Sequence, residues 1–481
     1  MSNLSELLPT GGGQNSVDFV ATGTLASGQA VALKADGTVE AVSGVAQAVG
    51  SPVVFEAAST LDISSAFDSV NNKVIITYSD SGNSNYGTAI VGTVSGTSIT
   101  FGTPVVFNTR YTSATQCVYD SNAGKIVIAY GDWVSASYAN GTAIVGTVSG
   151  TSISFGTAVT YRAAGAFIAF NTIAFDSTNN KVVICYRDGG NSDYGTAIVG
   201  TVSGTSISFG SAVVFESAYT QYPWPVFDST NNKVVIAYRD QGNSNYGTAI
   251  VGTVSGTSIS FGSAVVFESA TIIYISSAFD SNSGKVVIAY RDDASVFYYG
   301  TAIVGTVSGT SISFGSPAVF NAALTTYIST TFDSTNNKVV IAYTTNPLTG
   351  LSIVGTVSGT SISFGSATTI HTAGSSYTAA TYDSNANKVV IAYQDNGNSA
   401  YGTAAVLTVG SSNNTSFIGI TAEAISSAAT GPVNVYGGIN AVQTGLTIAS
   451  DYYVQVDGSL STTTSTVKAG QAISATTINM K

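Results

Sequence analysis

Three arginines are the first candidates for chemistry, because they recur at one position of neighbouring repeats: Arg187, Arg239 and Arg291. Arginines that converge on one point can bind a substrate carboxylate in a bidentate manner. Each of them, however, directly precedes an aspartate of its own repeat. We therefore expect the arginines to point outward and to pair locally, and we assign them no catalytic role.

Other arrangements that carry chemistry are weak in this sequence. The chain has one histidine, so neither a Ser/His/Asp triad nor a metal–histidine site is expected. Paired carboxylates for glycoside hydrolysis stay open, with Asp62, Asp132 and Asp293 as the notable acids. Oxygen ligands for calcium could come from the segment D-x-G-N-S-x-Y, which recurs at 80–86, 188–194, 240–246 and 395–401. This segment lacks clustered carboxylates, so we predict turn chemistry, no metal site and no cofactor.

A repeat of roughly fifty residues organises most of the chain. The repeat contains a segment FDSTNNKVVIAY, and a second segment, YGTAIVGTVSGTSISFGSAVVF, follows its first six copies in more or less intact form. Each copy predicts four short strands joined by Asp/Asn and Gly turns, which is typical of propeller blades. The most constant segment, FDSTNNKVVIAY and its variants, occurs in seven copies, whose turn aspartates are Asp68, Asp120, Asp176, Asp228, Asp280, Asp333 and Asp383.

The seventh copy lacks its fourth strand, because the pattern stops after YGTAAVLTV. A matching strand lies at the other end of the chain, since GSPVVFEAAS (50–59) resembles FGSAVVFESA (261–270). We therefore predict an all-β protein with a seven-bladed β-propeller of four-stranded blades over residues 49–409. The N-terminal strand would close the last blade and remove an exposed sheet edge. Residues 1–48 and 410–481 would form a small β-domain beneath the ring, opposite its variable side.

The connections at the two ends of each predicted blade differ. One end has near-identical turns, DSTNNK and VSGTS, whereas the connections at the other end vary, as at 108–116, 162–172, 216–225 and 371–378. Rigid scaffolds commonly carry recognition residues on such variable loops. Aromatic side chains there could stack on sugar rings or fill a protein pocket, or they could simply pack the central channel. The candidate ligand-binding residues are Tyr111, Trp133, Phe167, Tyr222, Trp224, Phe297, Tyr298 and His371.

Composition argues against several classes of function. The net charge of −11 disfavours a nucleic-acid-binding surface, which needs clustered Lys and Arg. Cys117 and Cys185 lie at different positions of different repeats, so we expect buried hydrophobes and no disulfide or zinc site. No window approaches about eighteen apolar residues, and the N-terminus has no recognisable secretion signal. We therefore expect neither a membrane span nor export by a signal peptide.

Both chain ends resemble structural proteins of tailed-bacteriophage virions, including tail-fibre and capsid-decoration proteins. The likeness is carried by GTLASGQAVALKADGTVEAV (23–42) and GLTIASDYYVQVDGSLSTTTSTVKAGQAISATTINMK (445–481), above all by the YYV…DGSLS segment. The resemblance implies an oligomeric protein of the virion, made in the cytoplasm of a bacterial host. It also implies that the chain-end domain binds other virion proteins.

We therefore expect a non-enzymatic virion structural protein whose variable side faces outward and is available to a host-surface glycan or receptor. Two alternatives stay open: a glycan-active propeller enzyme of sialidase or glycosidase type, and a bacterial surface adhesin. The repeats lack the S-x-D-x-G-x-x-W turns of sialidase-like blades, and the sequence shows no export route for an adhesin.

Overall fold

The computed structural model describes residues 15–163, 168–346 and 349–481, and this part of the chain is all-β. It divides into two compact units. One unit is Val49–Thr408; the other combines the chain ends, Met1–Ala48 and Val409–Lys481. Among the described residues, no helix is long and apolar enough to cross a membrane.

One copy of the repeat shows how the strands of Val49–Thr408 form. The KVVIAY segment is β20 (Lys233–Asp240), which pairs antiparallel with β19 (Val213–Asp228) and with β21 (Tyr246–Ser255). Its Val and Ile side chains are fully buried on both faces, as β-branched residues of an inner strand should be. The end of β21 pairs with the short β22 (Ser258–Phe261), and the start of β21 pairs with the start of β23 (Val265–Asp280).

The tight turn before β20 follows from one carboxylate. Asp228 Oδ1 accepts hydrogen bonds from the backbone N–H groups of Thr230 and Asn231, both at 2.9 Å. Asn232 completes the turn in a left-handed conformation, which asparagine tolerates well. All seven turn aspartates accept the same two backbone hydrogen bonds, so the predicted turn role of this aspartate is confirmed.

The same order of antiparallel strands recurs along the unit. Strands that lead into the turn aspartate are β6 (Val53–Asp68), β10 (Val105–Asp120), β15 (Ile168–Asp176), β19, β23, β28 (Thr325–Asp333) and β33 (Ser375–Asp383). Those that follow it are β7 (Lys73–Asp80), β11 (Lys125–Ser135), β16 (Lys181–Asp188), β20, β24 (Lys285–Asp292), β29 (Lys338–Thr345) and β34 (Lys388–Asp395). Next come β8 (Tyr86–Ser95), β12 (Tyr138–Ser149), β17 (Tyr194–Ser203), β21, β25 (Tyr299–Ser308), β30 (Thr349–Ser358) and β35 (Tyr401–Thr408). The short strands are β9 (Ser98–Phe101), β13 (Ser152–Phe155), β14 (Val159–Arg162), β18 (Ser206–Phe209), β22, β26 (Ser311–Phe314), β27 (Ala318–Asn321), β31 (Ser361–Phe364) and β32 (Thr368–His371).

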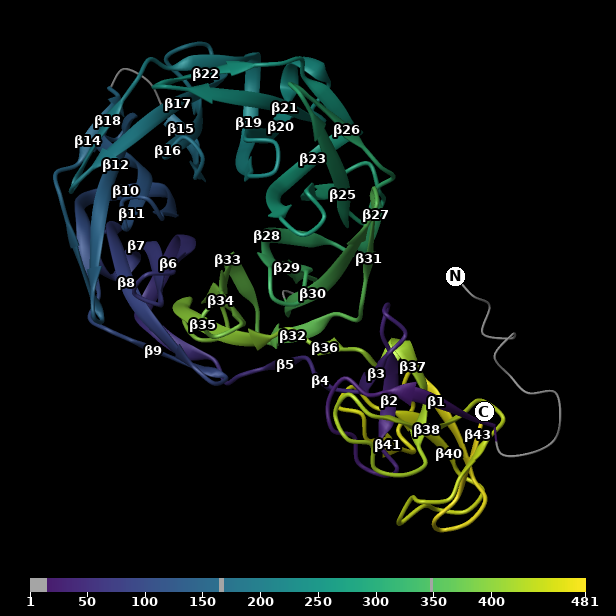
Figure 1. The fold of residues 1–481 in the computed structure, drawn as a ribbon. Coiled ribbons are helices and arrows are strands. Elements are labelled where there is room, and N and C mark those ends of the chain that lie inside the picture. Colours follow the sequence, from purple (N-terminus) through teal and green to yellow (C-terminus); the bar gives the residue numbers. More distant parts are fainter. Residues whose placement is uncertain (1–14, 164–167, 347–348) are drawn as a thin grey trace. The chain divides into compact units, whose positions relative to one another are not determined.

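The first group, which we call the inner strands, lies around the central opening of this unit (Figure 1). β6, β10, β19 and β23 are long enough to pair with one repeat at their start and the next repeat at their end, and they link the repeats into 13-stranded sheets. β35 pairs with β6, with Gly402 opposite Glu56 and Ala404 opposite Val53. Large antiparallel sheets built from a repeated unit are consistent with a β-propeller-like fold.

The predicted variable connections before the inner strands are mostly not loops, and this expectation was wrong. β10 and β19 run without interruption through 108–116 and 216–225. Only short breaks separate β27 from β28 and β32 from β33. The strands continue because their first residues pair with one repeat before the later residues pair with the next. Of the predicted connection at 162–172, residues 164–167 lie outside the described part.

Hydrogen bonds from side chains join neighbouring inner strands where no backbone ladder links them. Ser276 Oγ accepts from the backbone N–H of Thr330 at 3.0 Å, and Ser329 Oγ accepts from that of Ala380 at 2.9 Å. Thr172 Oγ1 donates to the carbonyl oxygen of Pro223 at 2.7 Å. Together with the apolar clusters between adjacent repeats, these bonds hold the inner strands in a defined register.

The chain-end unit contains two five-stranded sheets, in the orders β1-β38-β37-β2-β3 and β39-β43-β42-β40-β41. Asp-Gly turns at Asp36-Gly37 and Asp457-Gly458 join β2 to β3 and β40 to β41, with φ of 83° at both glycines. Residues of both chain ends pack into shared apolar clusters. The strands are β1 (Ser16–Val20), β2 (Ala30–Leu33), β3 (Val39–Ala41), β37 (Phe417–Thr421), β38 (Thr430–Val435), β39 (Ile439–Asn440), β40 (Asp451–Val454), β41 (Leu460–Ser461), β42 (Lys468–Ala472) and β43 (Ile478–Met480). Short pieces β4 (Gly44–Val45) and β36 (Ser411–Ser412) also pair, and β5 spans Ala48–Val49.

Candidate functional site

Each inner strand has a bulge in its pairing with the strand that follows it, at the same place in every repeat. In β19 the pairing register with β20 shifts between Gln221 and Trp224, and in β23 it shifts between Ile273 and Ser276. A residue in the left-handed region of φ sits at each shift, six positions before the turn aspartate. These bulge residues are Asp62 (φ 50°), Ala114 (48°), Phe170 (56°), Tyr222 (52°), Tyr274 (54°), Tyr327 (51°) and Tyr377 (49°).

This backbone conformation is unfavourable for the residues that adopt it. A left-handed residue other than glycine costs about 1 kcal/mol or more, and aromatic residues seldom occur there. The paired residues on both sides of each bulge fix it in place. Strained backbone of this kind is often found at binding and catalytic sites, so the bulge residues identify a candidate site.

Five of the bulge residues form a continuous aromatic arc across successive repeats. The ring centroids of Phe170 and Tyr222 lie 4.6 Å apart, and those of Tyr222 and Tyr274 lie 6.3 Å apart. Tyr327 continues the arc at 5.4 Å from Tyr274 and 5.3 Å from Tyr377. The four tyrosine hydroxyls make no hydrogen bond within the described residues, so they can bind a ligand.

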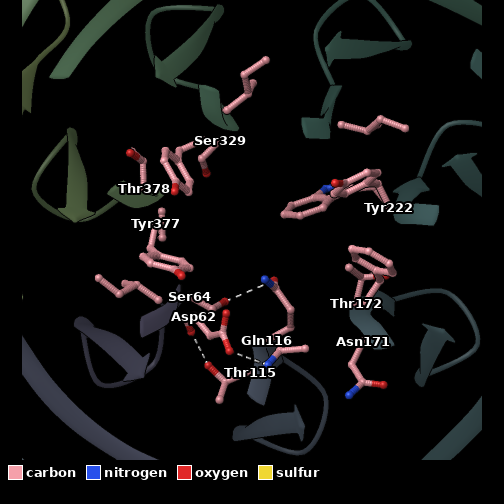
Figure 2. Close-up of a pocket in the computed structure, with 18 of the residues that line it drawn as sticks. Asp62, Ser64, Thr115, Gln116, Asn171, Thr172, Tyr222, Ser329, Tyr377 and Thr378 are labelled. Carbon is pink, nitrogen blue, oxygen red and sulfur yellow. Dashed lines mark hydrogen bonds between the residues drawn. The ribbon is translucent and has the colours of Figure 1, made fainter. Parts of the chain in front are cut away.

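The aromatic arc lines a cavity of about 450 Å³ at the centre of the unit. Figure 2 shows Tyr222 on one side of this cavity, Tyr377 and Asp62 on the other, and Gln116 between them. Trp224 also lines it, two residues beyond Tyr222. A concave site with many apolar atoms and a few polar groups is the usual form of a small-ligand site.

The polar side of the cavity is built by neighbouring inner strands. Asp62 Oδ2 accepts a hydrogen bond from the backbone N–H of Ala114 at 2.8 Å, and Thr115 donates its hydroxyl to the Asp62 carbonyl oxygen. Gln116 Oε1 accepts from Ser64 at 3.3 Å. Burial raises the pKa of Asp62, because desolvation penalises the carboxylate. Burial, and then the nearby charge of Asp62, raises the pKa of Tyr377 to about 12.

Two of the three recurrent arginines contact the aromatic arc, so the expectation that they point outward was wrong. Arg187 lies 5.3 Å from the ring centroid of Phe170, and Arg291 lies 5.3 Å from that of Tyr274. They do pair locally, but with Asp193 (3.3 Å) and Asp293 (2.6 Å) and not with the aspartates that directly follow them.

Two of the predicted binding residues, Tyr222 and Trp224, line the cavity, although they do so from strand β19 and not from a loop. Tyr111 and Trp133 instead pack edge to face against each other, with centroids 5.4 Å apart, in β10 and β11. Trp133 Nε1–H donates to Ser113 Oγ at 2.8 Å. This pair does not belong to the cavity lining.

The remaining predicted residues lie apart from the cavity lining. Phe297 is 61% exposed and stacks on Tyr299, and Tyr298 is 45% exposed and lies near Arg291. His371 Nε2 lies 2.8 Å from Asp395 Oδ1, so the one histidine joins two adjacent repeats. Phe167 lies outside the described residues.

Sequence reasoning missed four rings of the cavity, Phe170, Tyr274, Tyr327 and Tyr377, and named Asp62 only as one acid of a possible carboxylate pair. A signal for them was present. When the repeats are aligned on the turn aspartate, the column six positions earlier reads Asp, Ala, Phe, Tyr, Tyr, Tyr, Tyr. Four tyrosines in one column of the inner strands indicate a shared role.

The carboxylates of the D-x-G-N-S-x-Y segments are used within their own turns. Asp80 Oδ1 accepts from the backbone N–H of Gly82 at 2.9 Å, and Asp240 Oδ1 accepts from that of Asn243 at 3.1 Å. Over the ranges that the structure describes, no group of three or more His, Cys, Asp or Glu residues could hold a metal ion. Both cysteines are buried and unbridged.

No protein-family model matches this sequence, and no curated protein matches it. Among solved structures, one similar structure is that of a protein of unknown function from Dyadobacter fermentans DSM 18053. The sequence identity is 12%, the alignment covers 76% of this chain and 99% of that chain, and the TM-score is 0.46. So distant a likeness leaves the function to be argued from the cavity itself.

Proposed function

We propose that residues 49–409 form a seven-bladed β-propeller whose central cavity binds a saccharide without cleaving it. The blade count is supported by the seven turn aspartates and the seven equivalent bulge residues. The closing of the last blade by the N-terminal strand is supported by the pairing of β35 with β6.

The observation that carries the binding proposal is the aromatic arc. Rings that line a cavity can stack on the apolar faces of a sugar, and phenol hydroxyls can bond its hydroxyl groups. The arc supplies both, because its tyrosine hydroxyls are unpaired within the described residues. Glycoside hydrolysis ordinarily uses two carboxylates about 5 to 10 Å apart. Among the described lining residues, Asp62 is the one carboxylate, which favours binding over hydrolysis.

We further propose that the chain-end unit anchors the protein in a tailed-bacteriophage particle and that the saccharide belongs to the host surface. This part rests on the resemblance of residues 23–42 and 445–481 to virion structural proteins. It gives the cavity a role in host attachment, in which many weak sites on an oligomeric particle act together.

A glycan array with product analysis tests the proposed function. We expect the purified protein to retain a defined set of glycans and to release no sugar fragments. The variant Tyr274→Ala opens the aromatic arc and should weaken binding at least about tenfold. Phe297→Ala removes an exposed ring outside the cavity lining and should bind like the wild type. Absence of binding to every glycan, equal loss in both variants, or release of hydrolysis products would overturn the proposal.

A further inference from the structure

The charge of the cavity is set by one residue. Asp62 is acidic, and the described lining residues include no lysine, arginine or histidine. Asp62 Oδ2 is occupied by the N–H of Ala114, whereas Oδ1 accepts no hydrogen bond within the described residues. A half-buried carboxylate with one unsatisfied oxygen is therefore available to a donor that enters the cavity.

The rings near Asp62 strengthen the preference for a positive charge. Tyr377 lies beside Asp62 on the same side of the cavity (Figure 2), and Tyr327 is the next ring of the arc. The faces of aromatic rings carry negative potential and attract an ammonium group. Arg187 contacts the arc at Phe170, its far end, and Arg291 contacts it at the middle ring, Tyr274, where Asp293 pairs with the arginine at 2.6 Å. The site for a cation is therefore at the Asp62 end.

Gln116 supplies neutral donors next to this charge. Its Oε1 accepts from Ser64, and its side-chain N–H groups have no partner within the described residues. These N–H groups can donate to the hydroxyl or ring oxygens of a sugar. The combination of carboxylate, ring face and amide is suited to a sugar that carries a protonated amine.

We propose that the cavity is selective for amino sugars, with the ammonium group held between the Asp62 carboxylate and the Tyr377 ring, and the sugar ring against Tyr327 and Tyr274. This inference rests on the proposed saccharide-binding function and deepens it by naming the substrate class. A charge-assisted hydrogen bond in a desolvated site is stronger than a neutral one, so the amine dominates selectivity.

Calorimetric titration with a matched pair of ligands tests this inference. The probes are glucosamine oligosaccharides and their N-acetylated counterparts of equal length, at about pH 6, where the amine is protonated. We expect the wild type to bind the amine form at least about tenfold more tightly. Asp62→Asn should lose that preference, whereas Asp457→Asn, which removes the same charge from an exposed turn, should keep it. Tyr377→Phe should keep the preference and Tyr377→Leu should weaken it.

The outcomes separate this inference from the proposed function. Equal affinity for the two forms, reduced in both by Tyr274→Ala, would overturn the amine selectivity and leave saccharide binding in place. Preference for the N-acetylated form, or a preference for the amine that survives in Asp62→Asn, would also overturn it. Binding of neither form overturns the amine selectivity, and the glycan array then decides on the saccharide function. Matched thermal unfolding curves of the variants exclude a folding defect as the cause.

Discussion

The ring centroids of Tyr274 and Tyr327 lie 5.4 Å apart, and both residues adopt a left-handed backbone, with φ of 54° and 51°. They occupy the same position of neighbouring repeats, in β23 and β28. One local feature, the bulge of the inner strand, is therefore repeated around the cavity, with tyrosine at the bulge in four repeats and Asp, Ala or Phe in the other three. The uniform scaffold fixes the positions, and the residue at each bulge determines the chemistry.

Strain at the bulge predicts an unusual effect of glycine. Ala114 has φ of 48°, which costs a residue with a Cβ about 1 kcal/mol or more, whereas glycine adopts it without penalty. We expect Ala114→Gly to raise the free energy of unfolding by roughly 0.5 kcal/mol, after the larger chain entropy of glycine is deducted. Ala57→Gly, at an exposed position of β6 with ordinary φ, should lower it by about 0.5 to 1 kcal/mol. Urea unfolding measures both, and destabilisation in both variants would show that the bulge is not strained.

The one histidine should contribute to stability and not to binding. His371 pairs with Asp395 of the next repeat and lies against Tyr393, 5.3 Å between centroids. Asp395 also accepts hydrogen bonds from two backbone N–H groups, so its charge keeps partners when the histidine is removed. We expect His371→Ala to lower the free energy of unfolding by about 1 to 2 kcal/mol. Glycan affinity below the melting temperature should be unchanged; a loss of affinity without loss of stability would contradict this assignment.

Asp62 should make the protein less stable as the pH rises. Burial raises its pKa in the folded state above the value of the unfolded chain, about 3.9. A group of this kind stabilises the fold below its unfolded pKa and loses that contribution as the pH rises through its folded pKa. Asp62→Asn retains an acceptor for the Ala114 N–H but has no charge to desolvate.

The variant should therefore match the wild type near about pH 3.5 and become the more stable of the two by neutral pH. Chemical unfolding at a series of pH values gives the difference directly. A variant that is less stable than the wild type at neutral pH, and not at acid pH, would reverse the sign and contradict the assignment.

A cross-strand disulfide can report on the closure of the ring. Val53 lies opposite Ala404 in the pairing of β6 with β35, and both pack in one apolar cluster. The double variant Val53→Cys/Ala404→Cys should form a disulfide on oxidation and gain up to about 4 kcal/mol of stability, because the bond closes a very long loop. Non-reducing electrophoresis and thiol titration check it, with each single variant as control. Two thiols that stay reactive after oxidation would contradict the pairing.

Much of the strand pattern could be predicted from the sequence because it is local. Asp228 and its copies form the turns that their side chains favour, and Gly37 and Gly458, each after an aspartate, lie in the hairpin turns that Asp-Gly pairs favour. The incomplete seventh copy predicted the partner of the N-terminal strand, and β35 pairs with β6. These features depend on residues that are close in sequence or identical between copies.

The bulges and the cavity could not be predicted in this way. Tyrosine disfavours the left-handed backbone, so local preference argues against the conformation of Tyr222 and Tyr274. The conformation depends on pairing on both sides of the bulge, which the strand reaches only in the folded ring. The variation between repeats predicted a loop at 216–225, yet β19 pairs with β20 from Thr220 onward, and its bulge region lines the cavity. Equivalent residues of other repeats, Thr330 and Ala380, donate their N–H to a serine of the neighbouring repeat. Pro225 lacks this donor, and Thr172 of the neighbouring repeat instead donates to the carbonyl oxygen of Pro223.

Trp224 provides the most direct measurement of saccharide binding at the cavity. The chain has two tryptophans, and only Trp224 lines the cavity, so Trp133→Phe leaves a single reporter there. We predict that the emission of this variant changes and saturates on titration with glucosamine oligosaccharides, and that the emission of Trp224→Phe, which reports Trp133, does not change. A saturating change at Trp133 with none at Trp224 would place the saccharide elsewhere and contradict the central claim that the aromatic cavity is the binding site.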